Sequence, residues 1–145
     1  MAVEIVEVTE ATPAVQHALA RLLPQLNPTL SVPDMRRVQA LVDDPDVTLL
    51  FAKEGDEVIG TATVIVYTTP FWIKARIDEV VVDESARGKG IGEAIVRACL
   101  EVGGRKGAEV AELQSGRGPA RDVANRLYRR MGFQLRDSNL YRIRL

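Results

Sequence analysis

Residues 77–92 read IDEVVVDESARGKGIG, and this stretch decides the fold of the middle of the chain. Residues 80–82 are apolar in consecutive positions, which indicates a strand that is buried on both faces. A basic, glycine-rich turn follows, and a helical apolar pattern begins at Ile91. The first N–H groups of a helix lack partners within it, and the helix dipole favours negative charge there. With Arg87 and Lys89 beside it, this helix end is a candidate site for the pyrophosphate of a cofactor.

The whole chain has the length and composition of one globular domain, residues 1–145. Its formal net charge is −1, which argues against general nucleic-acid binding. Acidic residues gather in residues 1–60, and arginines gather in residues 117–145. The two groups are either ordinary solvated faces, or an acidic side for a cationic substrate and a basic side for a phosphorylated cofactor.

A single cysteine and a single histidine, Cys99 and His17, limit the redox and metal chemistry of the chain. One cysteine forms no internal disulfide and no cysteine-based zinc cluster, and one histidine argues against a histidine metal site. We therefore expect no metal. The first residues do not resemble a signal peptide, and no stretch approaches the length of a membrane span. We expect a cytoplasmic protein that binds neither nucleic acid nor membranes.

The spacing of apolar residues predicts strands and helices in a mixed order along the chain. Strands are expected at residues 3–8, 47–53, 57–67, 75–83 and 108–114, with a closing pair of short strands in residues 133–145. Helices are expected around residues 15–26, 31–43, 91–102 and 120–131. The dipeptide Gly55-Asp56 joins two of the strands into an antiparallel hairpin. This order predicts an α/β or α+β sheet that is covered by helices on both faces.

The glycine turn by itself does not identify its ligand. Its spacing is G-x-G-x-G, whereas a dinucleotide fingerprint needs G-x-G-x-x-G and a P-loop needs G-x-x-x-x-G-K followed by Ser or Thr. An ordinary tight connection between a strand and a helix is the alternative.

Two segments together resemble the GNAT superfamily of N-acetyltransferases. RGKGIG at residues 87–92 resembles its acetyl-CoA signature, Q/R-x-x-G-x-G/A, with Arg87, Gly90 and Gly92 on the three defined positions. ANRLYRRMGF at residues 124–133 resembles its A-x-x-F/L-Y-x-x-x-G-F segment. The order of elements over residues 3–145 is also similar. The resemblance implies a central mixed, mostly antiparallel sheet of six to seven strands with helices on both faces, splayed at the cofactor site between strands 75–83 and 108–114.

The resemblance implies transfer of an acetyl group from acetyl-CoA to a primary amine of a small molecule or a protein. It places the pyrophosphate on the backbone N–H groups from Gly88 to Glu93, and the pantetheine arm along the main chain of Val80 and Val82. Arg121 stands where many members have asparagine, which leaves that cofactor contact open. The expected cofactor-binding residues are Val80, Val81, Val82, Arg87, Gly88, Lys89, Gly90, Ile91, Gly92 and Glu93.

Two residues are expected to carry the chemistry. Glu79 is the candidate base for the amine, acting through a water, and strand alternation predicts that it shares a face with Ile77 and Val81 while Asp78 faces the other way. Tyr128, on the family's tyrosine position, is the candidate proton donor to the leaving thiolate. The alternatives are that Glu79 only orders water or pairs with an arginine, and that Tyr128 is a tyrosine at the edge of the core.

The substrate pocket is expected between the N-terminal helices and the loop 68–74, where Phe71 and Trp72 contact the acceptor, cover the core or form an oligomer face. The acceptor amine is left open, and a homodimer is expected only by analogy with the family. The alternative function is a domain that binds acetyl-CoA as a sensor or scaffold without turnover. Nucleic-acid binding through the arginine-rich end is a weaker alternative, which the acidic sequence pI disfavours.

Overall fold

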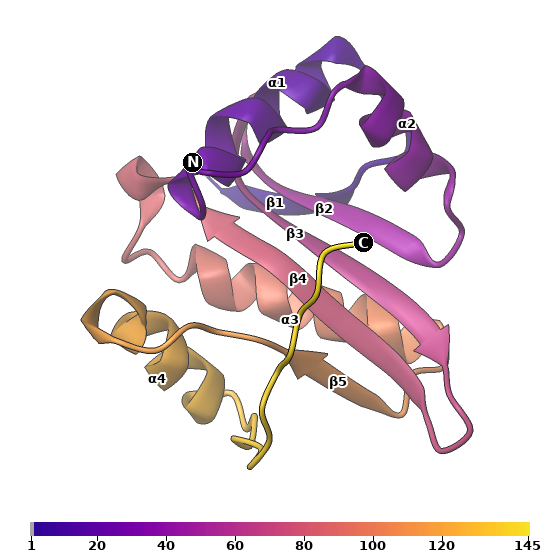
Figure 1. The fold of residues 1–145 in the computed structure, drawn as a ribbon. Coiled ribbons are helices and arrows are strands. Elements are labelled where there is room, and N and C mark those ends of the chain that lie inside the picture. Colours follow the sequence, from indigo (N-terminus) through magenta and orange to yellow (C-terminus); the bar gives the residue numbers. More distant parts are fainter. Residues whose placement is uncertain (1) are drawn as a thin grey trace. The chain divides into compact units, whose positions relative to one another are not determined.

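The structure is a computed structural model that describes residues 2–145, and in it the chain forms two compact units. The first unit ends at Gln114 and holds a sheet of strand order β1-β2-β3-β4-β5 (Figure 1). The second unit is Ser115–Leu145. The strands are β1 (Val3–Glu7), β2 (Val47–Glu54), β3 (Glu57–Thr68), β4 (Ile73–Val82) and β5 (Val110–Leu113). The helices are α1 (Pro13–Leu22), α2 (Met35–Asp43), α3 (Ile91–Arg105) and α4 (Asp122–Arg130), with 3-10 turns η1 (Leu23–Gln25), η2 (Glu84–Ala86) and η3 (Pro119–Arg121).

The sheet is mixed, as predicted. Strands β1 to β4 pair antiparallel in chain order, and β5 pairs parallel to β4. The predicted hairpin of β2 and β3 is confirmed, and Gly55 takes a positive φ of 63° in its turn. A parallel neighbour needs a crossover connection, and α3 provides it between β4 and β5.

The expected six to seven strands overstate the sheet, which has five strands in residues 2–145. The missing pair is the one predicted in residues 133–145, where the structure assigns no strand. Apolar residues recur there at Leu140, Ile143 and Leu145, but all three side chains are exposed. A strand is held by ladder hydrogen bonds to a neighbour, and this segment forms no such ladder.

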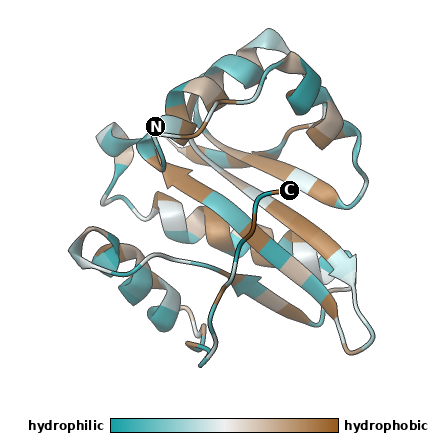
Figure 2. Ribbon diagram, in the orientation of Figure 1, coloured by the Kyte–Doolittle hydropathy of each residue, from teal (hydrophilic) through white to brown (hydrophobic). Residues whose placement is uncertain are grey.

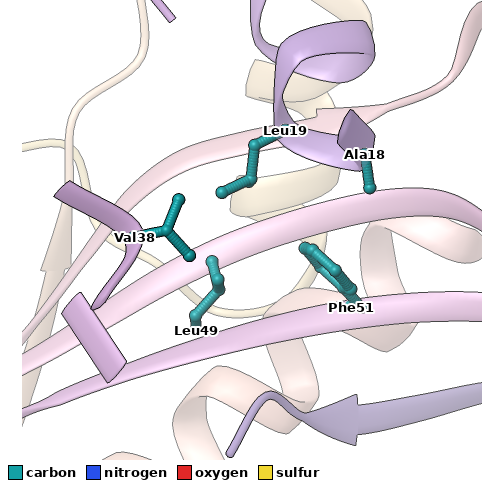
Figure 3. Packing of buried hydrophobic residues seen from close by; sticks show 5 residues of the cluster. All are labelled: Ala18, Leu19, Val38, Leu49 and Phe51. Atoms are coloured by element: carbon teal, nitrogen blue, oxygen red, sulfur yellow. The ribbon is translucent and has the colours of Figure 1, made fainter. Parts of the chain in front are cut away.

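Helices cover both faces of the sheet in the first unit, with α1 and α2 on one face and α3 on the other (Figure 1). Figure 2 shows that apolar residues dominate the middle strands between these two layers. On the α1–α2 face, a buried cluster joins the two helices to β2 (Figure 3). Its members are Ala18, Leu19, Val38, Leu49 and Phe51.

On the other face, α3 lies very close to the strands. A Cβ added to Gly60 of β3 would stand 2.6 Å from Ile95 Cδ1, and one added to Gly103 of α3 would stand 2.8 Å from Ala75 Cβ. Glycine at these two positions therefore allows the close approach of helix and sheet. Among residues 2–145, the structure has no helix long and apolar enough to cross a membrane.

Candidate active site

Strand β4 contains a bulge at Glu79. Thr61 of β3 pairs with Val81, but Thr63 pairs with Asp78, so β4 has one residue more than β3 over this stretch. Glu79 has a φ of 55°, the only positive φ of a residue other than glycine among the described residues. Such a conformation is uncommon and strained for a glutamate, and bulges of this kind occur next to active sites.

The bulge changes which residues share a face, so the predicted alternation was wrong. Residues that pair across an antiparallel ladder point to the same side. Ile77 pairs with Val64, whereas Val81 pairs with Thr61, three residues away and therefore on the opposite face. Asp78 pairs with Thr63 and faces away from Ile77, as alternation predicts; the extra residue puts Glu79 beside Asp78 on the α1–α2 face, where both line one cavity.

A cavity of about 480 Å³ lies between this face of the sheet and the α1–α2 region. This volume is within the range of small-molecule pockets. The prediction that the N-terminal helices line the pocket agrees with the structure, but no described residue of the loop 68–74 lines it. Phe71 is 89% exposed, and Trp72 is also exposed. About half of the wall is apolar, including Leu19, Leu23, Leu41, Val47, Leu49 and Ile65.

Glu79 has the electrostatics of a candidate base. Partial burial of its carboxyl, and then the negative charge of Asp78, raise the pKa of Glu79 above its ordinary value of 4.5. Asp78 itself accepts a hydrogen bond from Arg76 Nε at 3.1 Å. A carboxylate with a raised pKa on a cavity wall is a candidate for proton transfer.

The ladder between β4 and β5 is short, so β4 has an edge without a β5 partner. Pairing runs from Lys74 with Val110 to Ile77 with Leu113, and β4 continues to Val82 beyond it. The ladder ends where β5 ends, at Leu113, so the predicted splay between these two strands stays a prediction. Such an edge presents backbone N–H and C=O groups to a further strand or an extended ligand.

The edge groups come from alternate residues. The N–H of Asp83 donates to the Ile59 carbonyl of β3 at 2.8 Å, and Val81 pairs with Thr61. Val80 and Val82 therefore turn their backbone groups away from β3, while those of Val81 turn toward it. The Val82 carbonyl also accepts a hydrogen bond from Arg87 Nε at 3.1 Å.

The predicted glycine turn leads from β4 through η2 into α3. Gly88 and Gly90 both have a φ of 79°, and Gly90 is the N-cap of α3. A Cβ at either glycine would meet no atom within 4 Å, so the outer side of the turn is open. The turn therefore suits a ligand that approaches the backbone at the start of α3, and the side chains of Arg87 and Lys89 are exposed beside it. The remaining predicted residues of this site, Ile91, Gly92 and Glu93, form the first turn of α3.

The structure adds a group of residues that the sequence did not indicate. Asp83, directly after β4, is buried and accepts hydrogen bonds from Gln25 Nε2 at 2.9 Å, Ser85 Oγ at 2.8 Å and Arg21 Nη1 at 3.2 Å. Gln25 Oε1 also accepts from the N–H of Glu84 at 3.0 Å. The hydrogen bonds from Gln25 and Ser85, together with the charge of Arg21, lower the pKa of Asp83.

These contacts link α1 and η1 to the segment that connects β4 with the glycine turn. The partners are 58 and 62 residues apart in the chain, so no local spacing could predict them. The only feature of the sequence that could have indicated this group was the position of Asp83, an acidic residue at the end of a buried strand.

Tyr128 lies in the second unit, on α4. It is buried, and its ring packs edge to face against Phe133 with the ring centroids 5.9 Å apart. The Phe133 N–H donates to the Tyr128 carbonyl at 3.0 Å, and Asn125 Nδ2 donates to the Gly116 carbonyl at 3.0 Å. The second predicted motif is therefore a locally ordered helix end, and the role of Tyr128 stays a prediction.

Comparison with solved structures finds the same fold in acetyltransferases. The aminoglycoside acetyltransferase HMB0005 from an uncultured soil metagenomic sample has a TM-score of 0.87 at 18% identity, over 100% of this chain and 99% of that one. The aminoglycoside acetyltransferase meta-AAC0020 from a similar sample, solved with sisomicin, has a TM-score of 0.82 at 20% identity, over 99% and 95%. A ribosomal-protein-alanine N-acetyltransferase from Brucella melitensis biovar Abortus 2308 has a TM-score of 0.77 at 23% identity, over 99% of each chain.

At these identities the structures show a shared fold. No functionally curated protein sequence matches the chain. Residues 13–133, most of the chain, match the family described as Acetyltransferase (GNAT) family. This match confirms the resemblance carried by residues 87–92 and 124–133, and the chain belongs to the GNAT family of acetyltransferases.

Proposed function

We propose that the protein moves an acetyl group from acetyl-CoA to a primary amine of a small molecule or a protein. One observation carries this proposal: the bulge of β4 brings the Glu79 carboxylate to a cavity wall, where the partner strand β5 no longer covers the β4 edge. The same short stretch of chain therefore offers a base to an amine and backbone groups to an extended ligand.

The residues that would hold acetyl-CoA follow that stretch directly. Backbone N–H groups from Gly88 to Glu93 suit a pyrophosphate, because the turn is open and the helix dipole favours negative charge. The edge groups of Val80 and Val82 suit the amide-containing pantetheine arm, which can pair like an added strand. When bound, acetyl-CoA supplies the acetyl group as an activated thioester.

Glu79 would make the amine reactive. A lysine-like amine has an ordinary pKa of about 10.4, so most of it is protonated at neutral pH. A carboxylate with a raised pKa accepts a proton more readily than an ordinary glutamate, directly or through one water. The cavity also holds the amine near the reacting centre, which lowers the entropic cost of the reaction.

Tyr128 is proposed as the group that gives a proton or a hydrogen bond to the leaving thiolate. The proposal rests on its position in the second family motif and on the ordering of its ring by Phe133. A tyrosine hydroxyl is able to donate in this way.

The decisive experiment measures the release of free CoA across polyamines, aminoglycosides, amino acids and peptides, together with the melting temperature in acetyl-CoA. We expect a higher melting temperature, because a ligand that binds the folded state stabilises it, and CoA release with at least one amine. Glu79→Gln should keep the shift and lose most of the release, while Glu101→Gln, an exposed control on α3, should keep both. No shift at millimolar acetyl-CoA would count against the cofactor assignment.

The second candidate function is a sensor or scaffold that binds acetyl-CoA without turnover. It differs from the enzyme in one outcome, a thermal shift without CoA release from any amine. The strained backbone at Glu79 favours the enzyme, since a binding module has no need for a strained carboxylate on a cavity wall.

A further inference from the structure

We propose that the acceptor is a small zwitterion, namely a primary amine that also carries an anionic group several bonds away. This inference rests on the proposed function and concerns the cavity on the α1–α2 face. The feature that carries it is a pair of opposite charges on the cavity wall, one from Glu79 and one from Arg37.

Four charged side chains line the cavity, and two of them are already engaged. Asp78 pairs with Arg76 at 3.1 Å, and Asp34 caps α2 by accepting from the Arg37 N–H at 2.9 Å. In the part of the chain that the structure describes, the Glu79 carboxylate and the Arg37 guanidinium make no hydrogen bond or ion pair. The cavity thus presents one uncommitted charge of each sign.

The two charges lie on different walls. Glu79 belongs to β4, whereas Arg37 belongs to α2, which packs over β2 through Val38 and Leu49 (Figure 3). Strand β3 lies between β4 and β2, and two strand spacings amount to about 10 Å. An acceptor that reaches both walls therefore has its amine and its anionic group separated by several bonds.

The cavity wall is apolar in part. Leu41, Val47 and Ile65 belong to that part, and burying an additional ammonium group against apolar side chains without a partner is unfavourable. A short aliphatic chain with one amine and one carboxylate would place its amine near Glu79, its carboxylate near Arg37 and its methylene groups against the apolar side chains.

The test compares acceptors that differ only in the carboxylate. The matched pairs are 4-aminobutanoate with butylamine and 6-aminohexanoate with hexylamine, and spermidine and kanamycin form a polycation arm. We expect the kcat/KM of at least one amino acid, measured by CoA release, to exceed that of its matched amine about tenfold or more, as a charge-assisted hydrogen bond from arginine allows. Arg37→Gln should remove most of this ratio, whereas Arg36→Gln, a neighbouring exposed arginine outside the cavity lining, should preserve it.

The other outcomes separate this inference from the proposed function. Equal kcat/KM values within each pair, a preference for spermidine or kanamycin, or an unchanged ratio in Arg37→Gln would overturn the zwitterion while leaving an acetyltransferase. A melting temperature that does not respond to acetyl-CoA, with no CoA release from any amine, would overturn both.

Discussion

Replacing Asp83 with asparagine should destabilise the protein by about 2–4 kcal/mol at neutral pH. Asp83 is buried and accepts from Gln25, Ser85 and Arg21 at 2.9, 2.8 and 3.2 Å. Hydrogen bonds to a charged group contribute about 1.5–3 kcal/mol each and are not additive, and the half-exposed Arg21 regains water when it loses its partner. We therefore expect the loss of about one to two such bonds.

The pH dependence gives this prediction a second test. Because the folded-state pKa of Asp83 is lowered, its ionised form adds stability above the unfolded pKa of about 3.9, and this stability is lost as the pH falls through the lower folded value. The difference between wild type and Asp83→Asn, measured by urea unfolding, should therefore shrink as the pH is lowered below 3.9.

A surface ion pair serves as the control. Glu7 and Arg105 approach to 3.0 Å, but both side chains are about half exposed, so Glu7→Gln should cost less than about 1 kcal/mol. An Asp83→Asn protein within 0.5 kcal/mol of wild type at pH 7, or a difference that grows in acid, would contradict the reasoning.

Four further substitutions test the site and the packing. Gly90→Glu should abolish the thermal shift by acetyl-CoA, because it strains a φ of 79° and adds negative charge at the start of α3. Glu79→Gln should lower kcat about 100-fold or more, and it should remove a rise of the wild-type rate with pH through a pKa above 4.5. Tyr128→Phe should lower turnover and leave the Kd for acetyl-CoA intact; equal turnover would remove it from the mechanism. Gly60→Val should cost about 1–3 kcal/mol in urea unfolding, since even its Cβ lies 2.6 Å from Ile95 Cδ1.

Local patterns predicted the elements whose signals are local. The apolar spacing from Ile91 identified α3, and Gly55-Asp56 identified the hairpin of β2 and β3. The same reasoning failed at residues 133–145, because alternating apolar residues form a strand only where a neighbour is available.

The candidate site was predictable only in part for a similar reason. Its glycine turn has a sequence signature, because the positive φ values of Gly88 and Gly90 strongly favour glycine. The bulge at Glu79 has none, since a register shift depends on how β4 fits against β3. Period-two alternation therefore placed Glu79 and Asp78 on opposite faces, whereas both line the cavity.

The sequence by itself determined the family, the order of the main elements as far as α4 and the turn that opens α3, because each depends on neighbouring residues and their backbone preferences. Tertiary structure decided which charges meet in the cavity and what holds the glycine turn in place. Arg37 and Glu79 line one cavity only when α2 packs on the sheet, and Gln25 reaches Asp83 only when η1 lies against the end of β4. Contacts between distant segments depend on helix packing and strand register. Neither leaves a pattern in the spacing of neighbouring residues, so the sequence alone does not predict these contacts.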